Sequence, residues 1–112
     1  MISRFRKIVV FFVVVLFCAL AAWATTPRLI QVTLGTGATQ IVVTSTYFNQ
    51  MTIQNNATHN IRYGDSTVSS TKGILLTPGG AGSTGTVSGQ QGDASQFYIA
   101  GTSGDVIDVL VW

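Results

Sequence analysis

Apolar and polar residues alternate along several short segments of the chain. In the segment 28–34, Ile30, Val32 and Leu34 fall on one face and polar residues fall on the other. A period of two residues is the pattern of a β-strand with one buried face. Further strands are favoured, by alternation or by β-branched and aromatic residues, over the segments 40–48, 51–54, 60–64, 73–76 and 97–100.

The last segment, 105–112, carries apolar residues on both faces. Ile107, Val109 and Val111 point one way, while Leu110 and Trp112 point the other way. A strand of this kind is covered on each side, here by its own core and by a neighbouring sheet or subunit. The pattern therefore predicts a closing strand that is essential to the fold.

Turn residues separate the predicted strands. We expect a tight turn at Asn49-Gln50, and a hairpin that joins 51–54 to 60–64 through a long polar turn. Val68 is the one apolar residue of the segment 66–72, and we expect it to pin that segment to the core.

The segment 77–96 is poor in apolar residues and holds six glycines. This composition predicts a mobile glycine-rich loop, with a short strand around 86–88. Glutamate is absent and no window after residue 24 has helical spacing, which disfavours helices. Seven or eight short strands then predict an all-β fold, a small antiparallel β-sandwich or barrel.

The first 24 residues differ from the rest. Three basic residues precede an unbroken apolar run, 8–24, which ends in Ala22-Trp23-Ala24. This order is typical of a helical secretory signal peptide, with cleavage after Ala24, and it leaves 25–112 as a single β domain. The alternative is an uncleaved anchor in the inner membrane, because the run lies at the short edge of what spans a bilayer, roughly 17–25 residues.

Cleavage changes the charge of the protein. The whole chain has a net charge of +2, but the domain 25–112 keeps three basic residues against four aspartates, a net charge of −1. The basic balance therefore belongs to the targeting segment and does not indicate a nucleic-acid partner. A membrane is expected as a partner only through the first segment, if that segment is uncleaved.

The domain is small and has no cysteine, because Cys18 lies in the apolar run. A domain of this size buries only about 60–65% of its unfolded surface. Exported domains this small are often stabilised by disulfides, and none can form here. Association with further copies, or with another protein assembly, is then the expected source of additional stability.

The candidates for chemistry are few. His59 is the only histidine and lies in a predicted turn. A metal site would need His59 and two aspartates, and Asp105 and Asp108 cannot share one strand face. The glycine pattern 80–85 matches a dinucleotide fingerprint but lacks the strand and helix that such a site needs. We therefore expect no catalytic residue, no metal, no cofactor and no enzymatic activity.

Aromatic residues are the remaining candidates for an interaction site. Tyr47, Tyr63, Tyr98 and Trp112 would suit a sugar-binding platform, and they would equally suit packing in the core or at its rim. We take Trp112, Tyr63 and Tyr98 as candidate interaction residues.

A resemblance to a known class of protein rests on turn glycines and apolar alternation. The residues that carry it are Ile61-x-Tyr63-Gly64-Asp65, Val68-Ser69, Gly73-Ile74-x-Leu76-x-Pro78-Gly79 and the run from Phe97 through Gly101 and Gly104 to Leu110. In these runs the chain resembles small β-domain virion proteins of tailed bacteriophages, of the head-decoration or head- or tail-fibre type. The resemblance covers about half of the domain and implies a structural role without catalytic residues. The secretory signal departs from that family, whose particles assemble in the cytoplasm.

Two functions follow as hypotheses. One is a non-enzymatic structural or assembly protein, exported from the cytoplasm and located in the periplasm, outside the cell or on a virion. The other is a secreted or periplasmic binding module for a glycan or a surface partner.

Overall fold

The computed structural model describes residues 26–112, so the expected signal peptide, residues 1–24, lies outside the described range. Within residues 26–112, no helix is long and apolar enough to cross a membrane. The elements there are β1 (Arg28–Thr33), β2 (Thr39–Gln40), β3 (Tyr47–Gln54), β4 (Ile61–Gly64), β5 (Ile74–Leu76), β6 (Thr84–Asp93), the short 3-10 helix η1 (Ala94–Gln96), β7 (Tyr98–Ala100) and β8 (Val106–Val111).

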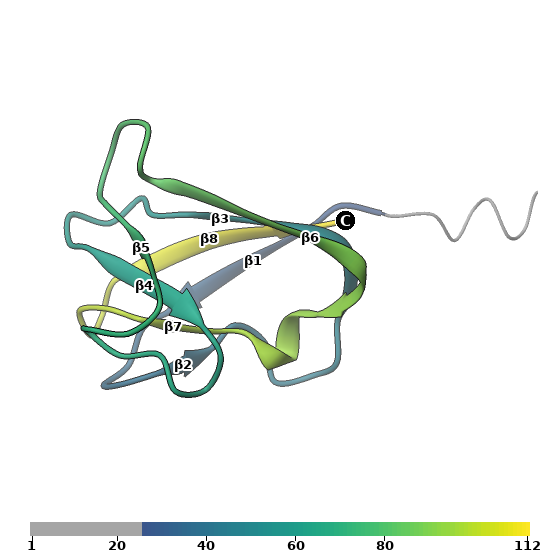
Figure 1. The fold of residues 1–112 in the computed structure, drawn as a ribbon, viewed down its shortest axis with the longest axis horizontal. Coiled ribbons are helices and arrows are strands. Elements are labelled where there is room, and N and C mark those ends of the chain that lie inside the picture. The colour runs from purple at the N-terminus through teal and green to yellow at the C-terminus, as the bar shows by residue number, and fades with distance from the viewer. Residues whose placement is uncertain (1–25) are drawn as a thin grey trace, which may run out of the picture.

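The strands form two four-stranded sheets that pack face to face (Figure 1). Sheet A has the order β1-β8-β3-β6, and sheet B has the order β2-β7-β4-β5. All neighbouring strands are antiparallel. The prediction of an all-β domain is confirmed, and the two layers make it a sandwich.

The pairing of the strands follows one rule. β1 pairs with β8, β2 with β7, β3 with β6 and β4 with β5. The described chain therefore follows the path of one long hairpin, whose turn lies between β4 and β5. The hairpin is rolled up so that its strands form two layers. The pairs β3–β8 and β4–β7 complete the two sheets. This order defines a jelly roll, an eight-stranded architecture shared by viral capsid domains and lectins.

The core lies between the sheets and takes alternate residues from each strand. Ile107, Val109 and Val111 of β8 share one face, as predicted, and point inward, with Val109 opposite Ile53 and Val111 opposite Met51 on the neighbouring strand. Four of these five side chains are 0% exposed and Val111 is 3% exposed. Burial of each contributes roughly 1.5–3 kcal/mol, so β8 stabilises both layers.

The predicted turn at Asn49-Gln50 is wrong, because both residues lie inside β3. The backbone N–H groups of Asn49 and Gln50 both donate to the carbonyl oxygen of Trp112, each at 2.8 Å. Two residues opposite one residue form a β-bulge, which absorbs the extra residue and increases the local twist. The strand thus continues through two residues that are common in turns.

The predicted hairpin of 51–54 with 60–64 is also wrong, because β3 belongs to sheet A and β4 to sheet B. Asn55 makes the corner between the sheets and is 1% exposed. Its side-chain amide donates to the carbonyl oxygens of His59 and Leu76, each at 2.9 Å, and its Oδ1 accepts from the N–H of Ala57. A satisfied buried amide replaces the pairing that a hairpin would have provided.

The predicted loop 77–96 is wrong over most of its length. β6 occupies ten residues of it, pairs with β3 and is the longest strand of the described chain. Gly85 and Gly92 lie beneath aromatic rings of the core, those of Tyr63 and Phe48. These glycines admit a close neighbour and do not serve flexibility. The turn before β6, around Gly79 and Gly80, matches the prediction, and the short strand predicted around 86–88 lies within the longer β6.

Two further expectations change in detail. The predicted strand 40–48 is interrupted, since β2 ends at Gln40 and β3 begins at Tyr47. Val68 is buried, with 5% exposed, but it lies outside the cluster between the sheets and packs against Gly64 and Gly73. It therefore pins its segment to sheet B from outside.

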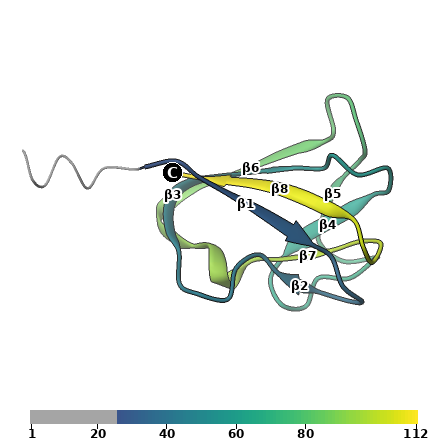
Figure 2. The ribbon, with the colours of Figure 1, turned by 180° about the vertical axis from the view of Figure 1, so that it is seen from behind.

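Figure 2 shows the fold from behind, with β1 in front. β1 begins beside the end of β8, and Arg28 pairs with Val111. Residue 26 and the C-terminus consequently lie at the same end of the sandwich (Figures 1 and 2).

Candidate functional site

The three candidate interaction residues lie in three different places. Tyr63 points into the core and is 8% exposed. Tyr98 lies opposite Gly64 on β7, and its neighbour Ile99 points inward, so Tyr98 faces outward from sheet B. Trp112 follows the inward-pointing Val111 and thus faces outward from sheet A. The fold does not bring them together into one aromatic platform.

His59 forms an ion pair with a residue of another turn. Its Nδ1 lies 2.9 Å from Oδ2 of Asp105, and the His59 side chain is 53% exposed. The contact joins the β3–β4 corner to the β7–β8 turn. Within residues 26–112, no group of three His, Cys, Asp or Glu side chains is placed to hold a metal ion.

The outer surface of sheet A, called here the sheet A face, spans the four strands β1, β8, β3 and β6. Its residues alternate with the core residues of the same strands. They are Leu29, Gln31 and Thr33 of β1, Gln50, Thr52 and Gln54 of β3, Thr84, Thr86 and Ser88 of β6, Val106, Asp108 and Leu110 of β8, and the adjoining Trp112.

One end of the sheet A face is apolar. Leu29 lies directly opposite Leu110 in the pairing of β1 with β8, and the two side chains are 63% and 36% exposed. Trp112 continues the same face two residues beyond Leu110 and is half-buried. A cluster of exposed apolar side chains with a tryptophan is typical of a contact surface.

The sheet A face carries a single charged side chain, that of Asp108. Its two carboxylate oxygens accept hydrogen bonds from Gln31, at 3.2 Å, and from Asn56, at 2.9 Å. The remaining polar residues of this face are neutral amides and hydroxyls. A second surface could therefore approach this face without stripping water from an unpaired charge.

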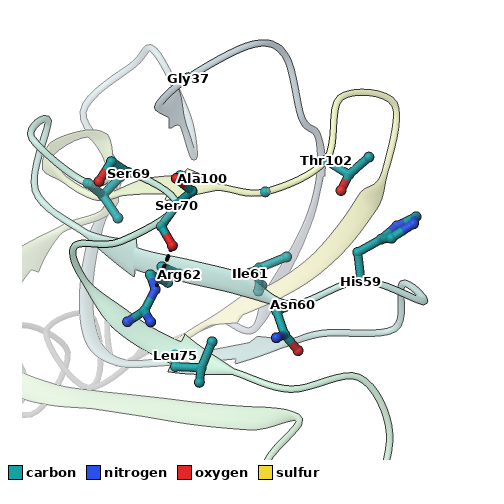
Figure 3. A pocket seen from close by; sticks show the side chains of 12 residues that line it. Gly37, His59, Asn60, Ile61, Arg62, Ser69, Ser70, Leu75, Ala100 and Thr102 are labelled. Atoms are coloured by element: carbon teal, nitrogen blue, oxygen red, sulfur yellow. Dashed lines mark hydrogen bonds between the residues drawn. The ribbon is translucent and has the colours of Figure 1, made fainter.

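A groove crosses the outer side of sheet B (Figure 3). Its volume is about 620 Å³. The floor lies over β4, β7 and β5, where Ile61 and Ala100 are almost fully covered, and the walls are the β4–β5 loop and the β7–β8 turn. Leu75 is 43% exposed and gives the floor an open apolar side.

Arg62 is the central cation of the groove. Its Nε donates to the carbonyl oxygen of Ser70 at 3.2 Å, and its Nη1 donates to that of Gly73 at 2.9 Å. These bonds hold the guanidinium in one orientation against the β4–β5 loop (Figure 3). No carboxylate is among the groove-lining residues in the described part of the chain.

The β4–β5 loop that forms one wall is ordered by local contacts. Asp65 accepts hydrogen bonds from both the backbone N–H and the hydroxyl of Thr67. The bond from the Thr67 hydroxyl, followed by that from its N–H, lowers the pKa of Asp65 below the ordinary value of 3.8. Gly73 closes the loop with a φ of 125°, and a Cβ there would stand 2.5 Å from Val68 Cγ2, so a side chain is excluded.

Sequence reasoning missed this groove because its residues come from distant segments. Asn60, Arg62, Ser70 and Thr102 line it together, although Thr102 is forty-two positions after Asn60. Each residue alone is an unremarkable turn or strand residue, so no local motif marks the site. No family model, curated protein or solved structure matches the chain.

Proposed function

We propose that this protein is a non-enzymatic structural protein, an exported jelly-roll domain of the virion type. Its copies associate through the sheet A face. The observation that carries the proposal is the pair Leu29–Leu110 with Trp112, exposed on a sheet surface with one charged residue. The occupant of this face is a second copy of the chain.

The chemistry of the face supports a second copy. Interface cores are depleted in charged residues and enriched in aromatic ones. A face that is apolar at one end and neutral elsewhere is complementary to itself, since no like charges confront each other except Asp108. The symmetric pairing of two identical patches is the commonest way in which chains form dimers.

The size of the face predicts the strength of the contact. Four strands about 4.8 Å apart, with about six residues each rising about 3.3 Å, cover roughly 400 Å². Two such faces bury roughly 800 Å², which is below the roughly 1,200–2,000 Å² of a stable specific interface and in the range of weak, transient contacts. We therefore expect weak association, with a Kd in the range of about 10–100 µM.

Sedimentation velocity of the purified protein between about 10 µM and 1 mM tests this proposal. We expect the average mass to rise from monomer to dimer over that range. Leu110→Glu should abolish this rise in average mass, because dimerisation would bury the new glutamate, without a partner of opposite charge, against the same glutamate of the second copy. Trp112→Ala should weaken it while the monomer remains folded by circular dichroism.

Val43→Glu is the matched control. Val43 is 84% exposed in the segment between β2 and β3, away from the sheet A face, so it tests the effect of an added charge alone. A wild-type protein that stays monomeric at 1 mM would contradict the proposal. Equal loss of association in both glutamate variants would also contradict it. So would a protein that stays monomeric and binds lipid vesicles in a way that Leu110→Glu abolishes.

The exported location is part of the same proposal and rests on residues outside the described range. We expect N-terminal sequencing of the exported protein to begin at Thr25. A protein retained in the membrane with residues 1–24 attached would instead support the anchor. The jelly-roll order is compatible with a virion role, but the same architecture serves lectins, so the fold alone does not choose between them.

A further inference from the structure

We propose that the groove on the outer side of sheet B is a binding site for a sugar that carries a carboxylate, such as a uronic acid unit of an acidic glycan. This site is independent of the sheet A face, which lies on the opposite layer. The inference rests on three observations: an unpaired fixed cation, convergent neutral hydrogen-bonding groups and a floor of suitable size.

The cation is Arg62. A guanidinium has five N–H donors. Two of the Arg62 donors are used on the carbonyl oxygens of Ser70 and Gly73, and no carboxylate lines the groove within the described residues. The remaining donors are held in a fixed plane, which favours a planar carboxylate as the partner. A negatively charged ligand group would thus pair with a guanidinium that the protein holds in place without a carboxylate partner in the groove.

Neutral hydrogen-bonding groups line the same groove. The side chains of Asn60, Ser70 and Thr102 line the groove and come from the turn before β4, the β4–β5 loop and the β7–β8 turn. Together they offer an amide and two hydroxyls, which both donate and accept hydrogen bonds. Vicinal sugar hydroxyls require this mixture of donors and acceptors. His59 also lines the groove, and its Nδ1 contacts Oδ2 of Asp105.

The size and floor of the groove fit a sugar of one or two rings. Its volume of about 620 Å³ lies within the usual range for small-ligand sites, about 300–1,000 Å³. Leu75 is 43% exposed and is the accessible apolar side chain of the floor, so the C–H face of a pyranose can lie against it. An unbranched aliphatic acid would leave the wall hydroxyls without partners.

The test is a titration of the purified ¹⁵N-labelled protein, followed by NMR chemical shifts, with three probes. Glucuronate carries both the carboxylate and the ring, glucose carries the ring alone, and acetate carries the carboxylate alone. We expect saturable shifts at the amides of Arg62, Ser70 and Thr102 with glucuronate, with a Kd of about 1 mM for a ligand of this size. Glucose and acetate should each bind at least about tenfold more weakly than glucuronate.

Asn60→Asp is the diagnostic variant, because it places a carboxylate beside the ligand at an exposed position and leaves the loop bonds intact. It should weaken glucuronate at least about tenfold, through repulsion between like charges. Arg62→Lys keeps the charge and removes the planar fork, and should also weaken binding. Arg28→Gln removes a cation of sheet A, opposite Val111, and should leave binding unchanged, as the matched control.

The outcomes separate cleanly. Equal affinity for glucuronate and glucose would overturn the role of the carboxylate, and equal affinity for glucuronate and acetate would overturn a sugar site. Shifts that are scattered over the surface, or that persist in Asn60→Asp, would overturn the location. Leu110→Glu should not alter glucuronate binding, so a failure of self-association would not be confused with a failure of this site.

Discussion

The ring of Phe48 lies so close to Gly92 that a Cβ atom on Gly92 would stand 2.6 Å from Phe48 Cζ. The ring cannot move away freely, because Phe97 packs against it edge-on, with ring centroids 5.8 Å apart. Gly85 has the same relation to Tyr63, with 2.9 Å to its Cε1. The three glycines of β6 therefore differ in role: Gly85 and Gly92 make room for core aromatics, and Gly89 faces open space.

Replacing Gly92 by alanine should destabilise the domain by about 1–3 kcal/mol, as overpacking does in a rigid core. Gly89→Ala is the control in the same strand, because no heavy atom lies within 4 Å of a Cβ there. That variant should be neutral or more stable by up to about 1 kcal/mol. Urea unfolding measures both changes, and equal effects at the two positions would refute this account of β6.

Asn55→Ala should cost about 1–3 kcal/mol, because it leaves the carbonyl oxygens of His59 and Leu76 without the donor that now satisfies them. Asn56→Ala is the matched control. Asn56 is exposed and makes one side-chain bond, to Asp108, so its loss should stay within about 0.5 kcal/mol. A small effect at Asn55 would mean that water replaces its amide at the corner between the sheets.

Asp93 should make stability depend on acid pH. Its Oδ1 accepts from the N–H groups of Ser95, at 2.9 Å, and Thr46, at 3.0 Å. The bond from Ser95, followed by that from Thr46, lowers the pKa of Asp93 below its ordinary value of 3.8. Because the folded pKa is depressed, the stabilisation is present above 3.8 and is lost as the pH falls through the folded pKa.

The variant Asp93→Asn tests this sign. The difference in unfolding free energy between the wild-type protein and the variant should shrink as the pH is lowered from about 5 to about 2. Equilibrium unfolding at a series of pH values gives that difference. A constant difference over the whole range would show that the Asp93 charge is not linked to folding.

His59→Ala should change the unfolding free energy by less than about 1 kcal/mol. The ion pair with Asp105 is short, at 2.9 Å, but the histidine side chain is 53% exposed, and exposed pairs are worth about 0.2–1 kcal/mol. The double variant with Asp105→Asn isolates the coupling between the two side chains. A loss of several kcal/mol in unfolding free energy, or metal bound to the purified protein, would contradict the interpretation of His59 as an exposed turn residue.

Local patterns were sufficient to divide the residues of a strand such as β8 between its two faces, but they did not find the full extent of β6. The alternation predicted that Ile107, Val109 and Val111 share one face of β8 and that Leu110 and Trp112 share the other, because that property depends only on the pleat of a single strand. Which of the two apolar faces points inward was decided by the packing of the sheets. The burial of Val68 was also foreseeable, since an isolated apolar residue in a polar loop is more stable when covered.

The tertiary structure alone decided which strands are partners and what each glycine does. Asn49-Gln50 continues a strand because Trp112 is there to accept both N–H groups, and Gly85 and Gly92 lie in a strand because Tyr63 and Phe48 occupy the space above them. The groove around Arg62 likewise exists only when distant segments meet. The sequence by itself determined local periodicity, which is a short-range property of the backbone. The roles of turn residues, glycines and site residues depend on neighbours far along the chain, and only the rolled fold brings those neighbours together.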